Sequence, residues 1–250
     1  MHAKIVAMGD TRLHAQSIIK ALRQLVLRVE ERFPTTSLNG VCKDLLEQAE
    51  RSDRRVRAIA RPYMLLRGGL MILVVLGLAG QAVIISHMVN LFDFNVSNTE
   101  VFSFVEGVDA ALNTLILMGA GIFFLTTVEE RIKRRRALSD LHQLRAIAHI
   151  IDMHQLTKDP TAILGHGPRT QSSPDREPMT AFQLNRYLDY CSEMLSLTAK
   201  LAALYGQSAH DPVIINAVAD VENLTTALSR KIWQKIMLIN PNVMTGEDTH

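Results

Sequence analysis

One stretch without basic residues constrains the fold more than any other feature of this chain. From residue 68 to residue 130 there is no Lys or Arg, whereas both flanks are rich in arginine. Within this stretch, residues 68–92 form a run of 25 without a formal charge, and residues 110–128 form a run of 19. A helix rises about 1.5 Å per residue and a bilayer core is about 30 Å thick, so both runs are long enough to span a membrane. We therefore expect two transmembrane helices that form a hairpin.

The charges around the two runs predict the orientation of this hairpin. Basic residues lie before the first run and after the second: Arg51, Arg54, Arg55, Arg57, Arg61, Arg67, Arg131, Lys133, Arg134, Arg135 and Arg136. The connecting segment, 93–109, contains only acidic charges: Asp93, Glu100, Glu106 and Asp109. Positively charged flanks remain on the cytoplasmic side, so both termini should be cytoplasmic and the short acidic loop external. The first 35 residues lack the compact apolar core of a cleavable signal, which favours a bacterial inner (plasma) membrane.

The remaining segments have the apolar spacing of amphipathic helices. Apolar residues recur at intervals of three and four in the segments 11–33, 37–61, 137–157, 180–206 and 211–239. Residues 158–179 contain four of the eight prolines, so we expect a flexible loop there. No segment alternates as a strand does. The predicted fold is all-α, with a two-span transmembrane hairpin and a cytoplasmic bundle of N- and C-terminal helices.

The predicted organisation has three parts. Residues 1–66 form the N-terminal cytoplasmic helices, residues 67–128 the transmembrane hairpin with its external loop, and residues 129–250 the C-terminal cytoplasmic helices. The two cysteines, Cys42 and Cys191, both fall in cytoplasmic segments, where reducing conditions disfavour a disulfide. We expect both to be small buried apolar residues.

Charge and motifs exclude several classes of function. A formal net charge of +2 is too small to indicate nucleic-acid binding. The chain has no phosphate-binding glycine loop, no zinc-protease motif, no nucleophile elbow and no paired-cysteine motif. The glycines that flank His166 lie in the predicted loop and lack the strand and helix of a dinucleotide site. The sequence therefore favours a non-enzymatic protein without a cofactor.

Residues 138–156 form the segment with the most distinctive polar pattern. Leu141, Leu144, Ala148 and Ile151 make the expected buried face. Beside them His142, Arg145, His149 and Asp152 follow at spacings of three, four and three, which places them along one edge of a helix. A helix with so few charges should be central in the bundle, so we expect this polar stripe to be partly buried and to find partners.

Three interpretations of the polar stripe remain open. It can be a structural network in which Asp152 orients His149 and Arg145 meets an acidic group, with Asp189, Glu193 and Glu222 as the candidates. It can contact a ligand or a partner helix. It can also contribute His149 and Asp152 to a metal site, but His142 and His149 are about 10 Å apart along the axis and cannot bind one ion together.

Polar residues inside the predicted spans are the second set of candidates. Gln81 lies near the centre of the first span, where lipid offers no hydrogen bond, so it should bond to backbone, to another protein or to its own counterpart in a second copy. The glycines near mid-span, Gly77 and Gly80 in the first span and Gly119 and Gly121 in the second, should allow close packing of the two helices. Counting outward from them predicts that His87 contacts Asn113 across the hairpin.

These features lead to three hypotheses of function. The first is a hairpin anchor that displays a helical cytoplasmic domain for oligomeric assembly or for binding another membrane protein. The alternative is a small oligomeric ion channel or transport-associated subunit, in which Glu106 and Asp109 form an acidic external mouth. These two acids also suit the first turn of a helix, through its dipole. The third is a metal-dependent protein built on His149 and Asp152. The expected partners are the lipid bilayer and further copies of the chain.

Overall fold

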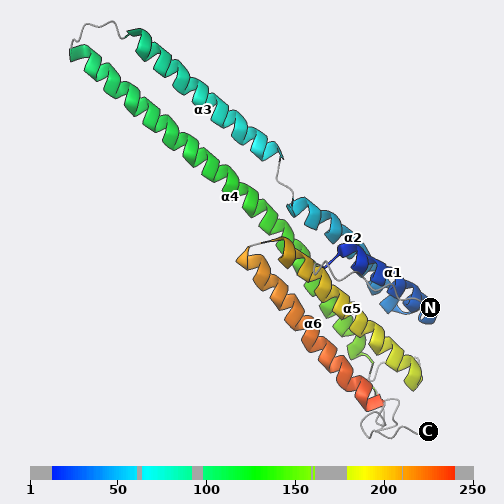
Figure 1. Ribbon diagram of the computed structural model, residues 1–250. Helices are drawn as coiled ribbons and strands as arrows, with labels where there is room; N and C mark the ends of the chain where they lie inside the picture. Colours follow the sequence, from blue (N-terminus) through cyan, green and yellow to red (C-terminus); the bar gives the residue numbers. More distant parts are fainter. Residues whose placement is uncertain are drawn as a thin grey trace, which may run out of the picture. The chain divides into compact units, whose positions relative to one another are not determined.

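The computed structural model describes residues 13–60, 64–91, 98–158, 160, 179–209 and 211–239. Within these residues the fold is all-α, as predicted, with six helices and no strand (Figure 1). The helices are α1 (Ala15–Arg32), α2 (Ser37–Ala60), α3 (Met64–Leu91), α4 (Asn98–Leu156), α5 (Ala181–Ser208) and α6 (Pro212–Ile239). The chain divides into two compact units. The bundle is Met1–Ala60 with Arg136–His250, and the helix-pair unit is Arg61–Arg135.

Helices α5 and α6 form an antiparallel pair in the bundle (Figure 1). Thr180 begins α5 with a capping box, in which its hydroxyl accepts from the backbone N–H of Gln183 and the Gln183 side chain accepts from the backbone N–H of Thr180. The carboxylate of Asp211 accepts from the backbone N–H of Val213 at 2.9 Å, which caps α6. The buried face of α6 has the alternating spacing of four and three that packs one helix along another: Ile214, Val218, Val221, Thr225, Leu228 and Ile232.

Helices α1 and α2 form a second pair, and both contact α5. The side chains of Leu22, Leu25 and Val29 on α1 are fully buried in the shared core. Phe33, just after α1, meets the ring of Tyr187 edge-on at 5.5 Å between centroids. This arrangement places α5 at the centre of the bundle.

The C-terminal part of α4 completes the bundle core. Ala137, Leu141, Leu144, Ala148 and Ile151 are at most 1% exposed and belong to the same apolar cluster as α1, α2, α5 and α6. The last four of these are the residues that the helical spacing predicted for the buried face. Cys42 and Cys191 are free and buried, as predicted.

The helix-pair unit contains α3 and the first part of α4, which lie side by side and run in opposite directions (Figure 1). Among the described residues, the stretch Val105–Leu156 contains an apolar window long enough to cross a membrane, and none of that window is buried. The apolar stretch Gly68–Val83 in α3 is shorter. In the described part of the chain, one helix is therefore long and apolar enough to cross a membrane by length and composition.

The segment between the two apolar runs is more helical than predicted. We expected a loop over residues 93–109 and a separate helix from residue 137, but α4 is a single helix of 59 residues that begins at Asn98. Glu100, Glu106 and Asp109 are helical for that reason. Residues 92–97 lie outside the described residues, as does nearly all of the predicted loop 158–179.

Candidate functional site

The polar stripe of α4 lies on the outside of the bundle. His142, Arg145 and His149 are exposed, and only Asp152 is half-buried. Asp152 accepts a hydrogen bond from Nε2 of Gln155 at 2.6 Å, one turn further along the same helix. The expectation that this stripe is partly buried is therefore wrong for its first three members.

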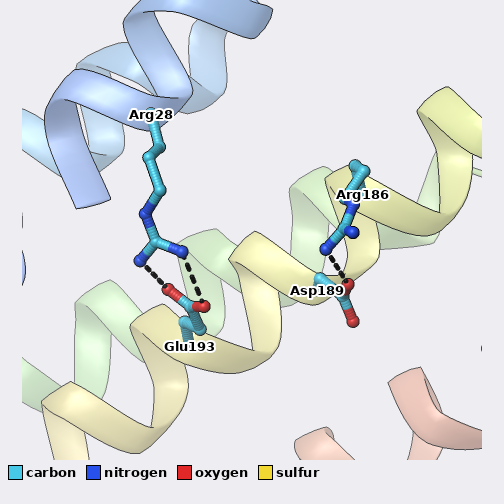
Figure 2. Close-up of polar contacts among 4 residues, drawn as sticks. All are labelled: Arg28, Arg186, Asp189 and Glu193. Carbon is cyan, nitrogen blue, oxygen red and sulfur yellow. Dashed lines mark hydrogen bonds and ion pairs between the residues drawn. The ribbon is translucent and has the colours of Figure 1, made fainter. Parts of the chain in front are cut away.

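The acidic partners expected for Arg145 are engaged elsewhere or exposed. Glu193 on α5 accepts two hydrogen bonds from the guanidinium of Arg28, at 2.6 and 3.1 Å (Figure 2). Asp189 pairs with Arg186 on its own helix at 3.3 Å (Figure 2). Glu222 is exposed on α6. The predicted ion pair of Arg145 with any of these three is therefore absent from the described part of the chain.

The metal interpretation gains no support from the geometry. No group of three or more His, Cys, Asp or Glu side chains that could hold a metal ion occurs among the described residues. His149 and Asp152 remain neighbours on α4 without a third ligand from another helix in that part of the chain.

The buried charge of α4 is instead Asp140, which has 0% exposure. Its carboxylate forms an ion pair with Arg55 of α2. Its second oxygen, Oδ2, accepts a hydrogen bond from the hydroxyl of Tyr205 on α5 at 2.9 Å. This polar node of Asp140, Arg55 and Tyr205 joins three helices at one point, because a buried carboxylate needs a counter-charge and hydrogen-bond donors.

The surroundings of the node are polar but well buried. Burial raises the pKa of the Tyr205 phenol above its ordinary value, and the charge of Asp140 adds to this rise. Tyr205 therefore keeps its proton and acts as a donor. Ser52 lies beside Tyr205 and is fully buried, and Gln48, one turn earlier on α2, has a buried Nε2 without a hydrogen-bond partner among the described residues.

The sequence contained a pattern that could have identified this node. Asp140 lies three residues after Ala137 and four before Leu144, which places it on the predicted buried face of the helix. Asp140 was not singled out as a candidate from the sequence. The partners Arg55 and Tyr205 are 85 and 65 residues away in the chain, and no local pattern connects them to Asp140.

A second polar contact lies at the C-terminal end of α4. The Nζ of Lys235 on α6 donates to the carbonyl oxygens of Gln155 at 2.8 Å and Lys158 at 3.2 Å. A cation at this position stabilises the free carbonyl groups of a helix end. Nearby, Nδ1 of His154 lies 3.2 Å from the hydroxyl of Ser37, and burial, followed by the charge of Lys158, lowers the pKa of His154.

In the helix-pair unit, Gln81 finds its partner within the chain. Its Nε2 donates to the backbone carbonyl of Ala111 on α4 at 3.0 Å. The sequence left backbone, another protein or a second copy open as the partner of Gln81. The structure shows a backbone carbonyl on the other helix of the pair. Equal depth in the two predicted spans would put Met118, Gly119 and Ala120 opposite Gln81, which is wrong by about two turns.

Two glycines set the spacing of α3 and α4. A Cβ at Gly77 would lie 2.9 Å from Sδ of Met118, and a Cβ at Gly121 would lie 2.8 Å from Cδ2 of Leu73. The prediction that glycines allow close approach is confirmed at these two positions. Gly80 and Gly119, which we also expected at the contact, have nothing within 4 Å.

The same contacts fix the register of the helix pair. Leu73 lies opposite Gly121, Gly77 opposite Met118, and Gln81 opposite Ala111. Asn113 is exposed and lies within one turn of Ala111, at the level of Gln81. The predicted contact of His87 with Asn113 does not fit this register, and the side chain of His87 lies outside the described residues.

No protein-family model, curated protein or solved structure matches this chain. Its function is therefore argued from the two units themselves.

Proposed function

We propose that this protein is a non-enzymatic membrane anchor, in which a two-span hairpin holds a helical bundle at the cytoplasmic face for oligomeric assembly or partner binding. The observation that carries the proposal is the contrast between the two units. The bundle encloses a continuous apolar core. In the helix-pair unit the large apolar side chains lie outside, with exposures of 58 to 68% at Met71, Leu76, Val105, Ile116 and Leu117.

Lipid is the environment that suits such a surface. Soluble proteins rarely expose contiguous apolar patches of more than a few hundred Å². Helix α3 has 28 residues, which corresponds to about 42 Å and exceeds a bilayer core of about 30 Å. The internal bond of Gln81 also suits lipid, where a free amide has no partner. These features support two spans, and the flanking arginines support cytoplasmic termini in a bacterial inner membrane.

A topology experiment tests the anchor. An enzyme reporter that is active only outside the cytoplasm is inserted within residues 92–97, and in separate chains is fused to either terminus. We expect activity from the insertion and none from the two fusions. Activity at a terminus, or a protein that alkaline carbonate washes from the membrane, would overturn the two-span arrangement.

A cation channel is the second candidate, and one observation favours it. Glu106 and Asp109 are both exposed on α4, near the start of its apolar window. In an oligomer their carboxylates would ring the external mouth of a pore. Purified protein in liposomes should then pass monovalent cations, and Glu106→Gln together with Asp109→Asn should reduce that flux. Absence of flux from the unaltered protein would leave only the anchor.

A further inference from the structure

Two arginines of α4 have no partner at the end of its apolar stretch. The helix-pair unit ends at Arg135, and the last turns of α4 in this unit contain Arg131, Lys133, Arg134 and Arg135. The side chain of Lys133 is 22% exposed and pairs with Glu129, one turn earlier, at 2.7 Å. Arg131 and Arg135, by contrast, are exposed, and neither forms an ion pair or a side-chain hydrogen bond within the described part of the chain.

The two unpaired arginines lie on one face of α4. They are four residues apart, which places their side chains one turn apart on the helix surface. Like charges at this spacing repel each other, and an anion between them removes that repulsion. Guanidinium groups bind phosphate through paired N–H···O hydrogen bonds, so a phosphate group is the anion that suits this position.

An exposed apolar line continues from these arginines along the same face. Leu117 and Phe124 precede Arg131 at intervals of seven residues, which is close to two helical turns, so the three side chains lie in one line. Leu117 and Phe124 are each 66% exposed. The line from Leu117 to Arg131 is about 20 Å long. An apolar surface of this length that ends at two cations matches a molecule with a long apolar chain and an anionic head.

We propose that this face of α4 binds an anionic phospholipid. Its phosphate lies between Arg131 and Arg135, and its acyl chains lie along Phe124 and Leu117. This inference rests on the proposed function, because the anchor brings α4 into lipid and places its arginines at the cytoplasmic surface. An acidic protein segment would match the two arginines, but acyl chains are the better match for the apolar line beside them.

Lipid binding to the full chain in detergent tests the proposal. Native mass spectrometry counts the phospholipids that bind during titration with phosphatidylglycerol, which is anionic, or with phosphatidylcholine, which is zwitterionic. The first phosphatidylglycerol should bind at a concentration about tenfold lower than the first phosphatidylcholine. Equal binding of the two lipids by the unaltered chain overturns the proposal.

A charge-matched pair of variants assigns this preference to the two arginines. Arg131→Gln with Arg135→Gln should abolish it. Arg230→Gln with Lys231→Gln removes the same charge from the surface of α6, where the two residues are adjacent and do not share a face. This control should keep the preference, and all four side chains are exposed, so neither variant should disturb the fold. A preference that survives in the α4 variant, or that is lost equally in both variants, overturns the proposal.

Inorganic phosphate separates a lipid site from a simple anion site. In large molar excess it should not displace phosphatidylglycerol, because it makes no contact with Phe124 or Leu117. Phe124→Gln should weaken the binding of phosphatidylglycerol for the same reason. Displacement by inorganic phosphate, or unchanged binding to Phe124→Gln, would show that the arginines bind phosphate alone and overturns the lipid assignment.

Carbonate washing of native membranes separates this inference from the proposed function. A chain that stays in the membrane but shows no preference for phosphatidylglycerol disproves the lipid site and leaves the anchor intact. A chain that washes out overturns the anchor, and with it the lipid site.

Discussion

At the scale of single residues, the polar node predicts an asymmetry between its two charged members. Asp140 has 0% exposure, whereas the side chain of Arg55 is 45% exposed. Removal of Arg55 leaves a buried carboxylate with Tyr205 as its one remaining partner in the node, but removal of the carboxylate allows Arg55 to reach water. We therefore expect Arg55→Met to lower the free energy of unfolding more than Asp140→Asn does. The difference between the two variants should be up to about 3 kcal/mol.

Thermal unfolding of the detergent-solubilised protein measures this difference. Arg54→Met is the matched control, because Arg54 is the exposed neighbour of Arg55 on the same helix. Its effect should be within about 0.5 kcal/mol. Equal effects of Arg55→Met and Arg54→Met would show that the ion pair contributes nothing to the fold.

The node also shows which buried residues could be predicted from the sequence and which could not. Helical spacing identified the buried residues Leu141, Leu144 and Ala148 correctly, because apolar residues at that spacing must share a face. It could not identify which polar residues are covered. Burial of Asp140 depends on Arg55 and Tyr205, which reach it only in the folded bundle. The His142, Arg145 and His149 stripe was expected to be partly buried because a helix with so few charges should be central in the bundle, but these three side chains are exposed.

At the scale of helices, the spacing of α3 and α4 predicts a difference between two glycines of α3. A side chain at Gly77 would meet Met118, whereas Gly80 has nothing within 4 Å. Gly77→Val should therefore separate the helices and destabilise the helix-pair unit by about 1–3 kcal/mol. Gly80→Val should be tolerated. Resistance to unfolding by SDS measures both, and equal loss of resistance would exclude close packing at Gly77.

Gln81 makes a second prediction at this scale. Its bond to the carbonyl of Ala111 joins the two helices of one chain. Gln81→Leu should lower the resistance of the helix pair to SDS by roughly 0.6–2 kcal/mol. It should leave the number of copies per particle unchanged in light scattering. A loss of assembly without a loss of stability would instead place Gln81 between copies, as the sequence alone allowed.

The helices of the bundle were predictable from local patterns. Capping residues such as Thr180 and Asp211 mark helix starts, and the four-three alternation marks the faces that pack. The continuity of α4 was missed because four acidic residues after the first apolar run suggested a loop. Acidic residues are compatible with a helix, and residues 98–136 contain no proline to end one.

At the scale of the whole molecule, both cysteines of the chain can be used to probe the core of one unit, the bundle. Cys42 and Cys191 lie in the bundle, and burial raises the pKa of each thiol from 9.0 to about 12. A maleimide should thus leave both unmodified in native membranes and react with both after unfolding in SDS. The thiol of Gln234→Cys, on the surface of α6, should react in native membranes and serves as the positive control.

The same thiols predict how the stability of the bundle depends on pH. Because the pKa of each thiol is higher in the folded than in the unfolded state, the folded state holds more protons between about pH 9 and pH 12. The contribution of the thiols to stability is complete below about pH 9 and is lost as the pH rises through that range. Each thiol should account for a loss of about 2 kcal/mol of stability at about pH 10.5.

Thermal unfolding at about pH 8 and about pH 10.5 tests this against a chain with Cys42→Ala and Cys191→Ala together. The two alanines lower the stability at both pH values through the cavities they leave, but they remove the part of the decrease that belongs to the thiols. Tyr187 and Tyr205, whose pKa values burial also raises, keep their part of the decrease in both chains. The natural chain should therefore lose more stability between the two pH values than the double variant. If both chains lose the same amount, the thiols ionise as freely in the folded bundle as in the unfolded chain, and the core around α5 admits water.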